Sequence, residues 1–154
     1  MISIADTVTP ERVELGLIAF DQQAAIRQVA DLLQNVSAVL DWETLYKGLC
    51  EASPCLAESG GEFSICLPHT RTDAVSSMVM SVGRFDSGVA FPKCPQPVRY
   101  IFCIGVPKAL ANDYLRIVGL LVRILREPVE ETRLFTAETP SDFVDRLSAL
   151  EAKL

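Results

Sequence analysis

The chain has 154 residues, of which 49% are hydrophobic, and its formal net charge at pH 7 is −6 with histidine neutral. This length and apolar share fit one compact domain over residues 1–154 with a sizeable core. Nucleic-acid affinity depends on clustered cations, and this acidic chain has no run of lysine and arginine. We therefore expect no nucleic-acid partner.

Two capped helices are expected in the first third of the chain. A turn at Thr9 and Pro10 precedes a short strand whose apolar residues share one face, namely Val13, Leu15 and Leu17. Asp21 would cap a first helix whose apolar residues follow helical spacing, namely Ile26, Val29, Ala30 and Leu33. Asp41 would cap a second helix that ends before Pro54 and turns four side chains inward, namely Trp42, Leu45, Tyr46 and Leu49.

The N-terminal stretch MISIADTVTPERVE lacks a basic leader and a long apolar core, so we expect no signal peptide.

The middle of the chain predicts strands. Segment 62–68 (EFSICLP) alternates apolar and polar residues, and segment 76–82 (SSMVMSV) follows after a short connection. The glycines and prolines of 83–97 predict a turn-rich excursion or hairpin. Segment 97–106 (PVRYIFCIGV) is apolar on both faces, which is typical of a central strand covered by helices on both sides.

The final third predicts helices. Residues 109–126 form a long helix that is apolar nearly all round, so we expect it to be buried against the sheet. Arg116 and Arg123 interrupt its apolar run, which excludes insertion into a membrane. A short helix begins at Pro128, and Ser141 would cap a last one with Phe143, Leu147 and Leu150 inward. The fold class predicted is α/β, with a mixed sheet and helices on both of its faces.

The five cysteines are scattered, and none belongs to a C-x-x-C pair. Without an export signal, we expect them to be reduced, mostly structural thiols of a cytoplasmic protein. Zinc needs several thiolate or imidazole ligands at short spacing, so one histidine with scattered cysteines does not predict a metal site. We expect neither metal nor cofactor.

The stretch SICLPHTRTD (64–73) contains His69, the only histidine of the chain. Pro68 fixes its own φ and favours an extended Leu67, so the imidazole is expected on rigid support at a strand end, where reactive groups collect in open α/β sheets. A histidine beside a core strand is more often structural. The chain has no G-x-S-x-G, P-loop or G-x-G-x-x-G motif. The chemistry that remains is general base catalysis, or attack of the imidazole itself on phosphorus.

The segment ICLPHTR (65–71) resembles the ALPHG(R/K) phosphorylation-site segment of the fructose–mannitol type IIA domains of the bacterial phosphotransferase system (PTS). That family includes the nitrogen-regulatory IIA proteins. Three further segments resemble the family in order and spacing: 9–33, 88–127 and 139–150. The resemblance therefore spans nearly the whole chain and identifies it as a single EIIA type-2-like domain.

This resemblance implies a mixed sheet of about five strands with flanking helices. It also implies that His69 receives a phosphoryl group from the phosphocarrier HPr or its nitrogen-branch relative. Sugar-specific members pass the group to a IIB domain, whereas in nitrogen-regulatory members the phosphorylation state controls target proteins such as potassium transport and sensor-kinase systems. A free-standing domain fits the regulatory branch slightly better, although separate sugar IIA chains exist.

The chain departs from the family pattern at three positions around the histidine. The family's arginine position falls at or near Ser53, its second histidine falls on Tyr114, and the glycine after the active histidine is Thr70. Tyr114 can donate one hydrogen bond but supplies no charge, and a serine loses the bidentate clamp of an arginine. Arg71 is the nearest residue that would replace the missing positive charge. The alternative, given equal weight, is that Arg71 is an ordinary surface residue. For Tyr114 the alternative is a core-facing aromatic residue. Lys47 and Lys108 are weaker candidates for a cation at the site. For Asp73 the favoured interpretation is a turn or cap residue, and the alternative is a residue that orients the imidazole.

Three functions therefore stay open. The first is a phosphohistidine relay or regulatory protein, an enzyme only in the sense of a phosphotransferase component. The second is a degenerate IIA-like interaction module that no longer transfers phosphate, which the replaced arginine and histidine suggest. The third is an unrelated catalytic domain with His69 as base, for which no partner carboxylate can be named.

Overall fold

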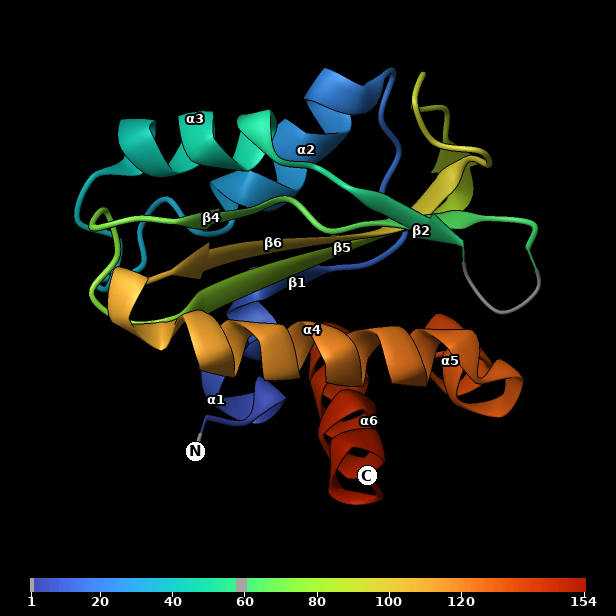
Figure 1. Ribbon diagram of the computed structural model, residues 1–154. Helices are drawn as coiled ribbons and strands as arrows, with labels where there is room; N and C mark the ends of the chain where they lie inside the picture. Colours follow the sequence, from blue (N-terminus) through green and yellow to red (C-terminus); the bar gives the residue numbers. More distant parts are fainter. Residues whose placement is uncertain (1, 58–60) are drawn as a thin grey trace.

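The computed structural model describes residues 2–57 and 61–154, which form one mixed β-sheet with helices on both faces (Figure 1). The strand order is β1-β5-β6-β3-β2, and β4 also pairs with β6. Neighbouring strands are antiparallel in the β5–β6 and β2–β3 pairs and parallel in the others. The strands are β1 (Val13–Glu14), β2 (Cys55–Ala57), β3 (Ser64–Cys66), β4 (His69–Arg71), β5 (Val79–Val89) and β6 (Val98–Val106).

Strand β6 is central, as its two apolar faces predict. Its side chains divide between two separate cores, with Tyr100, Phe102 and Ile104 in one and Ile101 and Cys103 in the other. All five are fully buried. The strand therefore joins two hydrophobic cores that lie on opposite faces of the sheet.

Each core is closed by its own set of helices (Figure 1). One face carries α2 (Gln22–Asp31) and α3 (Trp42–Glu51). The other carries α1 (Ile4–Thr7), α4 (Ala111–Arg126), α5 (Pro128–Phe135) and α6 (Pro140–Ala152). Short 3-10 turns at Pro10–Arg12 and Lys108–Leu110 precede β1 and α4. The α/β class with helices on both faces is confirmed.

Of the three expected side-chain caps Asp21, Asp41 and Ser141, two are confirmed, and α5 begins at Pro128 as expected. The side chains of Asp21 and Asp41 accept the backbone N–H groups of Ala24 and Thr44, and so cap α2 and α3. The prediction of Ser141 as the cap of α6 was wrong, because Thr139 accepts the N–H of Asp142 instead. Pro140 lacks an N–H and has a φ suited to the first helical position, so the helix begins there and its cap lies one residue earlier.

Helix α4 packs against the sheet as expected, but it is amphipathic, so the interpretation of its segment as apolar nearly all round was wrong. Its inward face consists of Ile117, Leu121, Ile124 and Leu125. The helix lies in an outer layer of the molecule, and its opposite side faces solvent, where Leu115 is 66% exposed. None of the described helices is long and apolar enough to cross a membrane.

The chain does not leave the sheet at Pro68. Strands β3 and β4 follow one another along the same edge of β6, interrupted only by Leu67 and Pro68. The described residues form six strands, where the resemblance implies about five. The Pro68 carbonyl accepts a hydrogen bond from the N–H of Ile104 at 2.9 Å. On the side away from β6, the N–H of Leu67 donates to the Pro54 carbonyl at 3.0 Å. His69 is therefore the first residue of strand β4, rather than a residue that follows the end of the strand.

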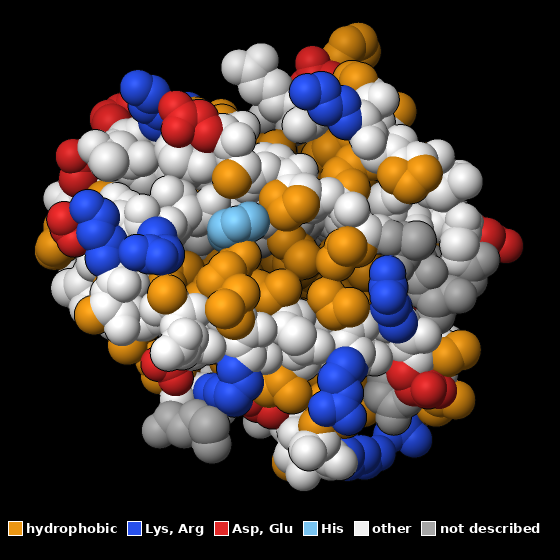
Figure 2. Space-filling model, in the orientation of Figure 1, with side chains coloured by type: hydrophobic (Ala, Val, Ile, Leu, Met, Phe, Trp, Pro, Cys, Tyr) orange, Lys and Arg blue, Asp and Glu red, His pale blue; other side chains and the backbone are white. Residues whose placement is uncertain are grey.

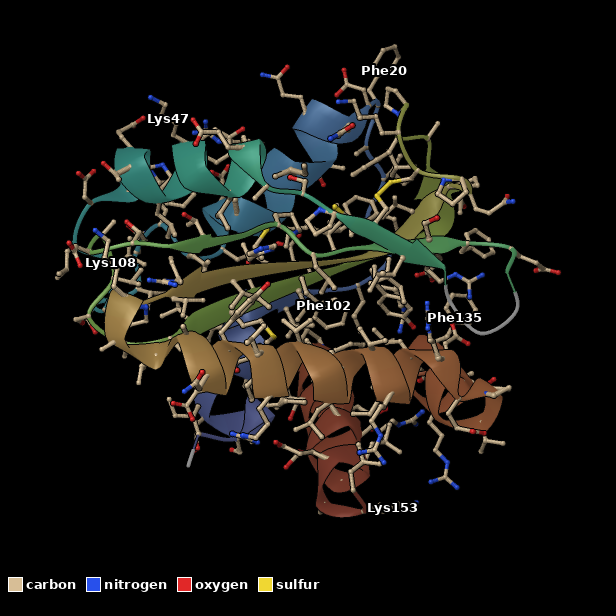
Figure 3. All side chains as sticks on the ribbon, in the orientation of Figure 1. Phe20, Lys47, Phe102, Lys108, Phe135 and Lys153 are labelled. Atoms are coloured by element: carbon tan, nitrogen blue, oxygen red, sulfur yellow. A yellow bond between two sulfur atoms is a disulfide. The ribbon has the colours of Figure 1, made fainter. Side chains whose placement is uncertain are left out.

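Two of the five cysteines form a disulfide, so the expectation of reduced thiols throughout was wrong. Cys55 on β2 is bonded to Cys94 in the segment between β5 and β6, with a Cα–Cα distance of 5.7 Å (Figure 3). The sheet brings these residues together across 39 positions of sequence, a separation that no local pattern reveals. Cys66 and Cys103 are free and buried, and Cys50 is free and exposed.

Candidate functional site

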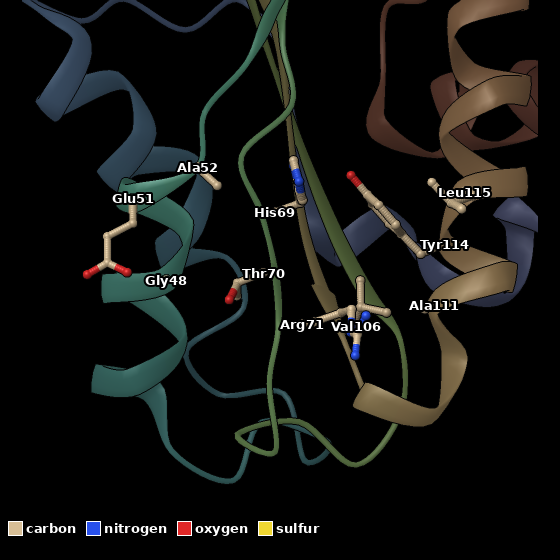
Figure 4. A pocket seen from close by; sticks show the side chains of 10 residues that line it. All are labelled: Gly48, Glu51, Ala52, His69, Thr70, Arg71, Val106, Ala111, Tyr114 and Leu115. Atoms are coloured by element: carbon tan, nitrogen blue, oxygen red, sulfur yellow. The ribbon is translucent and has the colours of Figure 1, made fainter.

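His69 lies in a cavity of about 460 Å³ between α3 and α4 (Figure 4). The polar side chains that line it are Glu51, His69, Thr70, Arg71 and Tyr114. The remaining lining is apolar and consists of Gly48, Ala52, Val106, Ala111 and Leu115. The site thus draws on two helices from opposite faces of the sheet and on the two strands between them.

The imidazole of His69 is held by one of its two nitrogens. Nδ1 lies 2.8 Å from the carbonyl oxygen of Leu67, which can only accept a hydrogen bond. The proton is therefore assigned to Nδ1, and Nε2 keeps its lone pair. Nε2 has no hydrogen-bond partner in residues 2–57 or 61–154. The backbone is fixed as well, because the His69 N–H donates to Ala52 at 3.0 Å.

Tyr114 packs against the imidazole from the first turn of α4. The two ring centroids are 5.0 Å apart and the planes are inclined by 28°. Figure 4 shows the hydroxyl directed towards the His69 side of the cavity. Burial raises the pKa of Tyr114, so the phenol stays protonated and remains a hydrogen-bond donor.

Arg71 is the one cation that lines this cavity. It lies two residues after His69 on β4, and alternate residues of a strand point to the same side. Lys108 pairs with Asp73 at 3.3 Å and lines a neighbouring cavity that it shares with Arg71. Lys47 lies on α3 outside the lining of the His69 cavity (Figure 3). Of the three cations considered from sequence, only Arg71 is therefore placed at the histidine.

No cation occupies the place of the family's arginine. The hydroxyl of Ser53 donates to the Leu49 carbonyl at 2.9 Å, and Ser53 does not line the cavity. Asp73 is also outside it and is paired with Lys108, so the structure does not bring that carboxylate to the imidazole. The carboxylate of Glu51 points away from His69 in Figure 4.

Gly48 is a site residue that the sequence reading missed. A β-carbon added there would lie 2.5 Å from Thr70 Oγ1 and 2.8 Å from Thr70 Cβ. Helix α3 can pack closely on β4 only because position 48 has no side chain. A glycine inside an amphipathic helix is the signal that could have indicated this contact.

The surface around the histidine is hydrophobic. In Figure 2 the one pale-blue side chain lies in a hollow among orange side chains, with blue side chains to its left. The apolar rim includes Leu115, at 66% exposure, and the partly exposed Ala111, while Val106 lines the cavity from its buried side. An apolar hollow with a nucleophile at its base is suited to receive a convex protein surface.

The comparisons with known proteins agree with this geometry. The family model for the EIIA 2 component of the phosphoenolpyruvate-dependent sugar phosphotransferase system matches residues 6–149. The PTS system fructose-specific EIIA component of Haloferax volcanii is 31% identical over 144 residues, which covers 92% of this chain and 93% of that protein.

Solved structures share the fold at low sequence identity. Nitrogen regulatory protein IIA-Ntr from Neisseria meningitidis has a TM-score of 0.79 at 18% identity, and the match covers 94% of this chain and 98% of that one. IIA mannitol from Escherichia coli has a TM-score of 0.72 at 19% identity, covering 92% and 99%. The family match over residues 6–149 confirms the resemblance seen in the sequence: the chain belongs to the EIIA type 2 family of the phosphoenolpyruvate-dependent sugar phosphotransferase system.

Proposed function

We propose that this protein is a phosphocarrier in which Nε2 of His69 accepts a phosphoryl group from an HPr-like protein and passes it to a IIB domain or a regulatory target. One observation carries the proposal. The proton on Nδ1 is directed to the Leu67 carbonyl, while the lone pair of Nε2 is left for the open cavity. A ring held in this way needs no reorientation before it attacks.

The transfer is a displacement at phosphorus. The Nε2 lone pair forms a new P–N bond as the P–N bond of the donor phosphohistidine breaks, and the donor ring keeps the released electron pair. The positive charge that develops on the His69 ring is offset by the hydrogen bond from Nδ1–H to the Leu67 carbonyl, at 2.8 Å. Donation to the IIB domain reverses these roles.

The transferred group is anionic and needs donors. Tyr114 would give one hydrogen bond to a phosphoryl oxygen, and Arg71 would supply the positive charge. Catalysis of phosphoryl transfer depends mostly on such positioning and electrostatics. With serine and tyrosine at the family's two cationic positions, Arg71 acts as the main electrostatic partner.

Two comparisons support the choice of partners. The IIA mannitol enzyme of Escherichia coli has been solved in complex with phosphorylated IIB mannitol, and its fold matches this chain with a TM-score of 0.71 at 19% identity. The relative from Haloferax volcanii is fructose-specific by name. We therefore place a sugar IIB domain first among the acceptors. The nitrogen-regulatory branch is the second arm of the test.

The decisive experiment is reconstitution of the transfer. The purified chain is incubated with phosphoenolpyruvate, enzyme I and either sugar-type or nitrogen-type HPr, and its intact mass is measured. We expect one added phosphoryl group that is acid-labile and absent in His69→Ala. A mass unchanged with every HPr, or the same gain in His69→Ala, would contradict the proposal. A sugar IIB domain is then added to the phosphorylated chain. Transfer of the phosphoryl group to IIB supports the sugar branch, and its retention on the chain supports the regulatory branch.

A degenerate interaction module is the second candidate, because Ser53 turns its hydroxyl to Leu49 and Tyr114 carries no charge. This candidate predicts that HPr or IIB binds the chain with equal affinity whether position 69 is histidine or alanine, and that no phosphate is transferred. Isothermal titration of both variants with the partner proteins distinguishes it from a working carrier.

A further inference from the structure

A second cavity, of about 510 Å³, lies at the other end of α4. It is lined by Arg123, Ile124, Arg126 and Glu127 from the end of α4, and by Leu150, Lys153 and Leu154 from the end of α6. Tyr114 and Arg126 are twelve residues apart on one helix, which places the two cavities about 18 Å apart along its axis. The second cavity is therefore separate from the His69 site.

Three cations surround this cavity with unused donors. The side chains of Arg123, Arg126 and Lys153 make no ion pair or hydrogen bond with any residue whose structure is described. Among the lining residues whose side chains the structure describes, Glu127 is the one acidic residue. The local charge is thus positive in a chain whose net charge is −6. The C-terminal ends of α4 and α6 carry partial negative charge and attract these three cations. This attraction does not supply hydrogen-bond acceptors to the N–H groups of the three side chains.

The floor of the cavity is apolar. Ile124 and Leu150 close it from below and are buried, so the apolar side chain accessible to a ligand is Leu154, which is 52% exposed. Two guanidinium groups can each bind a phosphate through paired hydrogen bonds, and an ammonium adds a third contact. The combination selects a ligand with a compact dianion at one end and an apolar body at the other.

We propose that this cavity binds a phosphomonoester, with its dianion among Arg123, Arg126 and Lys153 and its apolar body against Leu154. The proposal goes beyond the transfer reaction and does not depend on His69.

The test uses phenyl phosphate as the probe and the full chain labelled with ¹⁵N. Titration should shift the amide resonances of residues 123–127 and 150–154, and added salt should weaken the binding. In Arg123→Gln/Arg126→Gln we expect about a tenfold loss of affinity or more, because two charged donors are removed. The matched double variant Lys47→Gln/Lys93→Gln loses the same charge elsewhere and should bind phenyl phosphate like the original chain.

Three results would overturn the proposal. Shifts confined to residues 69–71 and 114 would assign the phosphate to the His69 cavity alone. Equal affinities in the two double variants would show non-specific attraction. Equal affinities for phenyl phosphate and inorganic phosphate would show that Leu154 takes no part. None of these results bears on whether His69 is phosphorylated, which the mass measurement decides separately.

A phosphomonoester can be a soluble metabolite or the headgroup of phosphatidic acid, and co-sedimentation separates the two sources. Vesicles of phosphatidylcholine with and without phosphatidic acid are compared. Pelleting that needs phosphatidic acid and is lost in Arg123→Gln/Arg126→Gln identifies a lipid headgroup. Phenyl phosphate binding without any pelleting identifies a soluble ester.

Discussion

At the scale of single residues, the site depends on how one imidazole is oriented. The Leu67 carbonyl is part of the same chain segment as His69, so the bond that selects the tautomer forms wherever this backbone conformation forms. Tyr114, in contrast, comes from a helix 45 residues further on and covers the ring only in the folded molecule.

Replacing Tyr114 tests its role as a donor. Tyr114→Phe keeps the ring that packs on His69 but removes the hydroxyl, so we expect the transfer rate to fall by about tenfold or more while the melting temperature stays close to its original value. Because burial raises the pKa of Tyr114, the hydroxyl is protonated throughout the neutral range. The ratio of the two rates should therefore be constant from about pH 6 to 9. A rate unchanged by the substitution would assign Tyr114 to packing alone.

Thiol reactivity should divide the free cysteines sharply. Burial raises the pKa of Cys66 to about 12 and that of Cys103 well above its ordinary value, so neither forms the reactive thiolate. Cys50 is exposed. Iodoacetamide at pH 8 should modify Cys50 in the native protein and reach Cys66 and Cys103 only after denaturation, as read by peptide mass spectrometry. Rapid native labelling of Cys66 would show that this core is open.

At the scale of elements, close packing of α3 on β4 positions the histidine. Thr70 on β4 stands where the family usually has glycine. Gly48 on α3 leaves room for the Thr70 side chain, because it has no side chain of its own. The contact is tested by changing both sides of it.

Gly48→Ala would gain about 1 kcal/mol of helix propensity but overpacks against Thr70 at a cost of about 1–3 kcal/mol. The 2.5 Å approach to Thr70 Oγ1 involves a β-branched side chain held in a strand, so we expect the overpacking to dominate and the variant to be destabilised. In a Thr70→Gly background the same substitution should instead stabilise the protein. Urea denaturation of the four variants measures the coupling, and additivity would show that the two residues do not compete for space.

The disulfide between Cys55 and Cys94 ties β2 to the segment before β6. Closing a loop of 39 residues should stabilise the fold by about 3–4 kcal/mol through the entropy of the unfolded chain. Cys94→Ser, or addition of dithiothreitol, should therefore lower the melting temperature, whereas Cys50→Ser should not. Dithiothreitol without effect on the original chain would show that the bond contributes nothing under those conditions.

At the scale of the whole molecule, the helix layers from the two faces of the sheet both contribute to the site around His69. Helices from opposite faces of the sheet, α3 and α4, form the walls of one apolar hollow (Figures 2 and 4). A partner must therefore contact both layers to reach Nε2. This arrangement predicts that the rim affects binding of the partner more than the chemical step.

Leu115→Asp tests the rim, since this side chain is 66% exposed and contributes little to the core. We expect the KM for the phosphorylated HPr to rise about tenfold with little change in kcat, because an exposed apolar anchor of the interface is lost. Val129→Asp, on α5 and outside the cavity, serves as the control. Equal effects of both substitutions would mean that the hollow is not the docking surface.

Short-range patterns were enough for much of the fold. Asp21 and Asp41 are caps that act within three residues, and the two apolar faces of 98–106 follow from residue type alone. Where neighbours in space decide, the predictions failed. Helix α4 reads as apolar nearly all round, but only one of its faces is buried, and Leu115 lies on the outer one. The strand continues beyond Pro68 because β6 supplies partners to His69 and Thr70.

The sequence by itself determined the α/β class, the order of most elements and the central strand, since each of these depends on local spacing, and it led to the proposal of His69 because that residue type occurs once. Tertiary structure alone decided the pairing of Cys55 with Cys94, the space that Gly48 leaves for Thr70, and the placement of Arg71 rather than Lys47 or Lys108 at the histidine. These depend on distances across the sheet between residues far apart in the chain, and no periodicity along the sequence encodes such distances.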